Sequence, residues 1–254
     1  MKNKDLFKYL FGCKSEILSE NIIVVPFIEP ERFMKGCNVL GSFSGKMYSG
    51  IKAEKSGREF CVIKCGIGSG QAGDAVILLK ESKVKNLLFV GSCGGLGDLD
   101  IGDIILGENA YNGEGFSRYY NGKGSQIDLS DEKETPRGSD KYMGCLRDLL
   151  ERKHEKYVKG KIYTTGSITA EEGSLLKRLE NEGFSAVEME LSAIYTASKK
   201  IGVNASSLLF VSDLPLKKPI WEIRTSPQHK GKMLEGLKKV IDISVEFVVD
   251  DAKF

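Results

Sequence analysis

Short apolar runs rich in β-branched residues alternate along the chain with segments whose apolar residues recur every three or four positions. The short runs predict buried strands at Asn21–Phe27, Glu59–Cys65, Asn86–Gly91, Asp103–Leu106 and Ser206–Ser212. The periodic segments predict helices at Gln71–Ser82, Asp140–Arg152, Met189–Ile201 and Gln228–Val249. Strands that alternate with helices are typical of a three-layer α/β/α domain around a mixed, mostly parallel twisted sheet.

The two ends of the chain and its polar middle complete this organisation. The first residues, MKNKDLFKYLFGCKSE, mix apolar positions with lysines, so we expect residues 1–20 to form a helical extension. No apolar run there is long enough for a signal peptide or a membrane span. Residues 21–254 are then expected to form a single domain. The segment Tyr119–Asp140 is rich in Gly, Ser, Asp, Glu and Lys and is expected to be a surface loop, either near a site entrance or simply solvated.

Composition narrows the chemistry that this domain can perform. Lys and Arg total 37 against 35 Asp and Glu, a formal charge of +2, which gives no electrostatic basis for a nucleic-acid or membrane partner. The two histidines, His154 and His229, lie far apart in the sequence, so no metal site is expected. Six cysteines without a CxxC pair indicate a reduced, cytoplasmic protein.

A glycine-rich turn follows the second predicted strand. Sites in α/β sheets lie beyond the carboxyl ends of the strands, and there Gly68-x-Gly70-x-x-Gly73 opens a helix. A dinucleotide site would need an acidic residue at the tip of the next strand. That strand has none between Phe89 and Cys93, so a nicotinamide-dependent oxidoreductase is the weakest interpretation. The glycines could equally serve close packing of helix and strand.

Three further strand ends carry polar groups. Gly91-Ser92-Cys93-Gly94-Gly95 offers a hydroxyl and small-residue amides that can cradle an anion, or it is a plain turn. Val187-Glu188-Met189-Glu190 places two carboxylates at a helix start, where such groups commonly cap the helix. Asp213 ends an apolar strand; it is either a turn residue or a carboxyl whose raised pKa suits a general acid.

Taken in order, the motifs GIGSG, VGSCGGL with IGDIIL, VEMELSA and VSDLP resemble the nucleoside phosphorylase-I superfamily. This superfamily contains purine nucleoside phosphorylases, uridine phosphorylases and nucleosidases. The resemblance runs from about Asn21 to the last helix and implies a nucleoside phosphorylase-like fold. It also implies a homo-oligomer, either a dimer or a trimer of dimers, whose sites are completed across the dimer interface.

The resemblance also implies roles for individual residues. Asp213 matches the acid that protonates a purine leaving group at N7, and uridine enzymes of the family lack an aspartate there. Met189 and Glu190 match the ribose-binding pair. The segment Glu29-Pro30-Glu31-Arg32 looks like the family's phosphate-binding D-P-x-R loop. The implied phosphate-binding residues are Ser92, Arg32 and Gly68, and the implied base pocket comprises Cys93, Gly94, Ile168 and Val187.

One departure bears on the reaction type. Phosphorylases of the family hold phosphate with an arginine three residues before Ser92, where this chain has Phe89; a phenyl ring cannot replace a guanidinium fork. Arg32 nevertheless favours phosphorolysis of a purine nucleoside, giving free base and ribose 1-phosphate, with inorganic phosphate as co-substrate and no other cofactor. The alternative is a nucleosidase similar to AMP nucleosidase or methylthioadenosine/S-adenosylhomocysteine nucleosidase. A nucleoside-binding protein without turnover is the third possibility.

Overall fold

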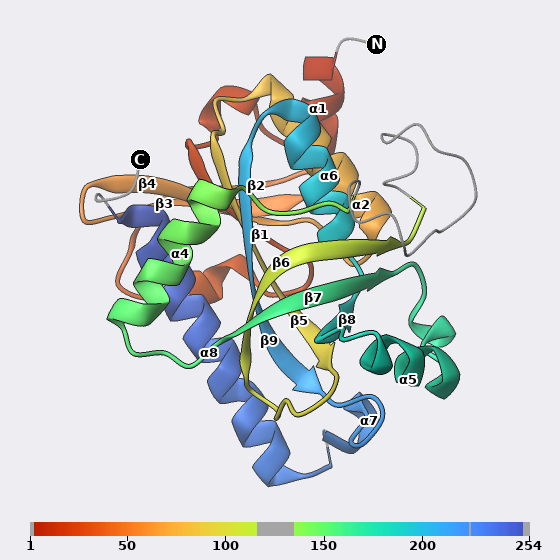
Figure 1. The fold of residues 1–254 in the computed structure, drawn as a ribbon. Helices are drawn as coiled ribbons and strands as arrows, with labels where there is room; N and C mark the ends of the chain where they lie inside the picture. Colours follow the sequence, from red (N-terminus) through yellow and green to blue (C-terminus); the bar gives the residue numbers. More distant parts are fainter. Residues whose placement is uncertain (1–2, 116–134, 224, 251–254) are drawn as a thin grey trace.

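A nine-stranded sheet forms the centre of the protein (Figure 1). The computed structural model describes residues 3–115, 135–223 and 225–250. Most of the predicted loop at 119–140 therefore lies outside the described residues. The strands are β1 (Asn21–Val25), β2 (Asn38–Ser44), β3 (Ser49–Lys55), β4 (Arg58–Lys64), β5 (Asn86–Gly95), β6 (Ile104–Gly113), β7 (Val158–Thr165), β8 (Ala186–Glu188) and β9 (Asn204–Asp213).

The sheet is mixed, and its strand order is β2-β3-β4-β1-β5-β8-β7-β6-β9, with a further pairing of β5 to β9. That pairing closes β5, β8, β7, β6 and β9 into a ring. Parallel ladders join β4 to β1, β1 to β5 and β5 to β9. The carboxyl ends of these four strands consequently lie along one edge, which is where ligands bind in sheets of this type.

Helices cover both faces of the sheet, which confirms the three-layer arrangement. The helices are α1 (Asn3–Phe11), α2 (Ser69–Leu78), α4 (Asp140–Arg152), α5 (Gly173–Asn181), α6 (Leu191–Ile201), α7 (Ile220–Ile223) and α8 (Pro227–Val249), with short 3₁₀ turns η1 (Ser15–Ile17), η2 (Pro30–Phe33), η3 (Leu79–Glu81) and η5 (Ile168–Ala170). Figure 1 shows α4 and α8 on one side of the sheet and α1, α2 and α6 on the other. Each layer buries its own apolar core against the sheet. No described helix has the length and apolarity needed to cross a bilayer.

The N-terminal helix belongs to the same packed body. Phe7 and Phe11 are fully buried and stack with ring centroids 4.2 Å apart. Phe11 also packs against Tyr48, at the start of the β3 region. The amphipathic pattern of the first residues therefore corresponds to a helix that contributes to the core of the domain.

Four strands and two short helices, α5 and α7, were missed by the sequence patterns. Strand β2 is almost entirely exposed and rich in Gly and Ser, so it shows no apolar alternation. Strands β3 and β7 are interrupted by lysines, β8 is three residues long, and α5 is a short, largely exposed helix. Strands β5 and β6 also continue to Gly95 and Gly113, past their predicted ends, because their last residues pair with β8 and β7.

Candidate active site

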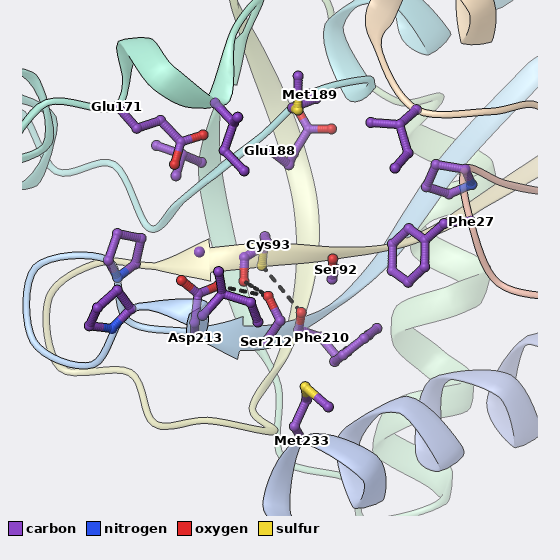
Figure 2. Close-up of a pocket in the computed structure, with 18 of the residues that line it drawn as sticks. Phe27, Ser92, Cys93, Glu171, Glu188, Met189, Phe210, Ser212, Asp213 and Met233 are labelled. Atoms are coloured by element: carbon purple, nitrogen blue, oxygen red, sulfur yellow. Dashed lines mark hydrogen bonds between the residues drawn. The ribbon is translucent and has the colours of Figure 1, made fainter. Parts of the chain in front are cut away.

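A cavity of about 560 Å³ opens where the ends of β1, β5, β8 and β9 meet (Figure 2). Its lining is largely apolar, with a small number of polar groups, as is usual for small-molecule sites. Four carboxylates line it: Glu171, Glu188, Glu190 and Asp213. Among the described residues that line the cavity there is no lysine, arginine or histidine. The pocket is therefore rich in carboxyl groups although the whole chain is nearly neutral.

Most of the residues expected at a site do meet in this cavity. The lining includes Asp213, Met189, Glu190, Ser92, Cys93, Gly94, Ile168 and Val187. Gly68 does not line it but contacts Glu190, as described below. Arg32 lies on the short turn η2, is exposed, and is not among the lining residues. The structure thus brings the expected acid, sugar and base residues together and leaves Arg32 outside.

Asp213 is the last residue of β9 and is presented to the cavity beside Ser212. The Ser212 hydroxyl lies 2.8 Å from Asp213 Oδ1 and 3.2 Å from the carbonyl oxygen of Cys93, so it anchors the carboxyl to the neighbouring strand β5 (Figure 2). Burial raises the pKa of Asp213, against smaller lowering effects from its hydrogen bonds to Ser212 and Ile220. A carboxyl that keeps its proton more readily than usual can donate it to a ligand.

Glu190 stands immediately before α6 and is buried, with 4% of its surface exposed. Its Oε1 accepts a hydrogen bond of 2.6 Å from the backbone N–H of Gly68. Gly68 has φ +103°, a left-handed backbone conformation that side chains other than glycine's rarely adopt. The glycine-rich turn therefore holds a carboxylate, and its amide is not free to bind a pyrophosphate. Burial raises the pKa of Glu190.

Glu188 fixes the start of α6. Its Oε2 accepts the backbone N–H groups of Glu190 and Leu191, each at 2.7 Å, and its Oε1 accepts the Thr164 hydroxyl at 2.5 Å. These bonds satisfy amides that have no partner within the helix. Burial and the neighbouring Glu190 raise the pKa of Glu188. Glu188 therefore positions the backbone that carries Met189 and Glu190 into the cavity.

We expect Glu188→Ala to lower the free energy of unfolding by about 2–5 kcal/mol, because it leaves three buried hydrogen-bond donors without an acceptor. Glu172→Ala is the control, because Glu172 is exposed at the start of α5 and its side chain makes no capping hydrogen bond. Urea denaturation of the two variants measures the difference. A loss no larger for Glu188→Ala than for Glu172→Ala would contradict the capping role.

Phe89 lies away from the cavity. It is 1% exposed and belongs to the apolar core between the sheet and the layer of α1, α2 and α6. Gly91 permits this packing, since a Cβ there would stand 3.1 Å from the Phe89 ring. The side chain at this position contributes to core packing and offers nothing to an anion.

Glu171 is a lining residue that the sequence patterns missed. It follows the turn η5 and precedes α5, in the polar stretch AEEG, which has the composition of an ordinary solvated loop. Neither periodicity nor a motif distinguishes Glu171 from its neighbour Glu172. The structure separates the two, since Glu171 lines the cavity and Glu172 is exposed.

Known proteins share both the fold and part of the sequence. A DeoD-type purine nucleoside phosphorylase from Bacillus cereus is 31% identical over 177 residues, which cover 66% of this chain and 68% of the relative. The chain spans about half the length of a DeoD-type relative from Clostridium perfringens, matching 55% of it at 30% identity. Among solved structures, a uridine phosphorylase from Vibrio fischeri has a TM-score of 0.80 at 21% identity, with 98% of this chain and 99% of that chain covered. An AMP nucleosidase from Bacteroides thetaiotaomicron has a TM-score of 0.66 at 21% identity, with 94% and 96% covered.

The fold and these relatives place the chain among proteins of the nucleoside phosphorylase and nucleosidase class. The sequence pattern of the Phosphorylase superfamily matches residues 29–237. The chain belongs to this superfamily.

Proposed function

We propose that the protein hydrolyses the N-glycosidic bond of purine nucleosides. The observation that carries this proposal is the lining of the cavity: four carboxyl groups and, among the described lining residues, no lysine, arginine or histidine that could hold a phosphate. Such a lining stabilises the cationic, oxocarbenium-like sugar of the transition state. It offers no cationic partner to a phosphate, whether inorganic phosphate as the attacking group or a phosphate on the sugar. Water, which needs no cationic partner, therefore fits this pocket better than phosphate as the attacking group. For the same reason a nucleoside fits it better than a nucleotide.

Asp213 supports a purine as the leaving base. When the C1′–N9 bond breaks, its electron pair moves onto the base, and protonation of N7 neutralises the charge. One well-placed acid accelerates such a step by about 10²–10⁴-fold. Uracil has no N7 and leaves with its charge on carbonyl oxygens, which need no acid. The water oxygen then bonds to C1′ and passes its proton to a pocket carboxylate.

Glu190 and Met189 support a ribose at the centre of the cavity. A carboxylate has about four acceptor positions, and the backbone hydrogen bonds of Glu190 to Gly68 and Met189 leave positions for two adjacent hydroxyls. Figure 2 shows Met189 and Ser92 on opposite sides of the cavity centre, with Asp213 toward one end and Phe27 toward the other. A nucleoside with its base at the Asp213 end places its sugar between Met189 and Ser92.

Phosphorolysis is the second candidate. The DeoD-type relatives favour it, and so does the Ser92 hydroxyl, which lines the cavity between small-residue amides. It requires a cation for the phosphate, such as one supplied by a neighbouring subunit of the expected homo-oligomer. Both candidates share the roles proposed for Asp213, Met189 and Glu190.

Base release with and without phosphate separates the candidates. Adenosine, inosine, methylthioadenosine and AMP are incubated with the protein in phosphate-free buffer and with added phosphate, and the products are resolved by chromatography. We expect release of base and free ribose sugar from the nucleosides at a rate that phosphate does not raise. Ribose 1-phosphate formed only when phosphate is present would establish phosphorolysis. Well-folded protein that binds nucleosides but releases no base would establish a binding protein.

A further inference from the structure

Glu171 is the carboxylate of the cavity whose hydrogen-bonding capacity is unused. Glu188 accepts three hydrogen bonds, Glu190 accepts backbone N–H groups, and Asp213 is held by Ser212. Within the described part of the chain, no hydrogen bond or ion pair engages the carboxyl of Glu171. A half-buried carboxyl that lines a cavity without a partner has a strong tendency to bind a donor from a ligand.

The turn that carries Glu171 is well anchored. The Thr165 hydroxyl donates to the Ser167 carbonyl at 3.0 Å, and the hydroxyls of Ser167 and Thr169 lie 2.9 Å apart. The Glu171 N–H donates to the Ile168 carbonyl at 3.3 Å, and the following helix α5 buries its leucines in a small apolar cluster. Local structure therefore fixes the backbone position from which Glu171 reaches the cavity.

Glu171 and Asp213 face the same end of the cavity from different elements. Figure 2 shows them at one side of the pocket, with Glu171 approaching from the end of β7 and Asp213 from the end of β9. Burial, and next the nearby Asp213 carboxyl, raise the pKa of Glu171 to about 7. A base that contacts Asp213 with one atom therefore presents the adjacent atoms of the same edge of its ring to Glu171.

The chemistry of purines determines what lies on that edge. N7 and the substituent at position 6 are adjacent: a 6-aminopurine presents an acceptor and an N–H donor there, whereas a 6-oxopurine presents two acceptors. Asp213 with its proton satisfies N7 in both cases. A second carboxyl that is ionised, as Glu171 is above its pKa of about 7, matches only the amino group, because a carbonyl oxygen at position 6 would face a carboxylate oxygen with no proton between them.

We propose that Glu171 is a specificity-determining residue that accepts a hydrogen bond from the exocyclic amino group of a 6-aminopurine, so that the site selects adenine-type over hypoxanthine-type bases. The inference rests on the proposed function, since it assumes that Asp213 marks the base end of the cavity. One well-formed hydrogen-bonded pair discriminates between bases by roughly tenfold or more. Glu171 acts on binding of the base and is not needed for protonation of N7.

The test compares Glu171→Gln with Glu172→Gln. Glutamine keeps the size of the side chain, and its amide can turn to accept from an amino group or to donate to a carbonyl. Glu172 is the next residue, carries the same group and is exposed. Calorimetric titration with free adenine and hypoxanthine measures base preference without turnover. Values of kcat/KM for adenosine and inosine measure it during turnover.

We expect the wild type and Glu172→Gln to prefer adenine and adenosine by about tenfold or more, and Glu171→Gln to bring both ratios close to unity. A wild type that favours hypoxanthine, or ratios unchanged in Glu171→Gln, would overturn the inference. The two proposals fail separately. Cleavage without a Glu171-dependent preference refutes the inference alone, whereas Glu171-dependent adenine binding without cleavage refutes the proposed function alone.

Discussion

Replacing Asp213 with alanine is expected to lower kcat/KM for purine nucleosides by about 10²–10⁴-fold, the contribution of one positioned general acid. The carboxyl is the last side chain of β9, it lines the cavity, and burial raises its pKa. Alanine removes the proton donor while leaving the backbone of the strand in place. Because the acid acts on the departing base, the loss should appear in kcat, with binding of the nucleoside changed by less than about tenfold.

A change of leaving group provides the internal control for this variant. A 4-nitrophenyl riboside releases 4-nitrophenolate, a stabilised anion that needs no proton to leave. Wild type and Asp213→Ala should therefore cleave this substrate at similar rates. Asp98→Ala serves as the matched substitution, because Asp98 follows a neighbouring strand end but is exposed and does not line the cavity. Equal losses on the purine nucleoside and the nitrophenyl riboside would show that Asp213 supports the structure of the site and does not act as its acid.

The strand ends of this protein could be located from the sequence because two signals coincide there. The runs that become β5 and β9 both contain the apolar sequence LLFV, as expected for strands covered on both faces, and each ends in polar or small residues. The sheet then places Ser92 and Asp213 at the same edge, since the two strands are parallel and in register from Asn86 and Asn204 onward. The alternation of strands and helices was therefore enough to predict that these residues lie at the carboxyl-terminal edge of the sheet.

Glu171 and the partner of Gly68 could not be predicted in the same way. The position of Glu171 at the cavity depends on how η5 and α5 fold back over the end of β7. The sequence AEEG contains no pattern that predicts this arrangement. The Gly68 amide and Glu190 are far apart in the sequence and meet only in the folded chain. The exposed strand β2 lacked apolar alternation because it buries little. Contacts that depend on tertiary structure leave no local periodicity.

The charge of the cavity also emerges only in three dimensions. The chain carries a formal charge of +2, and its acidic residues are spread along its length. Folding gathers Glu171, Glu188, Glu190 and Asp213 around one cavity and leaves the expected phosphate ligand Arg32 exposed outside it. The sequence slightly favoured phosphate as the attacking group, whereas a cavity lined by carboxyl groups and by no described cation favours water.

Replacing Glu190 with alanine is expected to abolish discrimination between ribosides and their 2′,3′-dideoxy analogues. Each hydrogen bond to a charged acceptor contributes about 1.5–3 kcal/mol, and tenfold in kcat/KM corresponds to about 1.4 kcal/mol. The wild type should therefore prefer adenosine over 2′,3′-dideoxyadenosine by about 10²–10⁴-fold if both hydroxyls bind Glu190. In Glu190→Ala the ratio should fall close to unity, through loss of activity on adenosine and not through gain on the analogue.

Glu180→Ala is a closely matched control for this comparison. Glu180 Oε1 accepts the backbone N–H of Gly97 at 2.9 Å, as Glu190 Oε1 accepts that of Gly68, but Glu180 does not line the cavity. Both variants lose an acceptor for a glycine amide, so a purely structural effect should be similar in the two. Preference for the riboside should survive in Glu180→Ala and disappear in Glu190→Ala. If Glu190→Ala lowered the activity on both substrates by the same factor, the carboxylate would be holding the Gly68 turn and not the sugar.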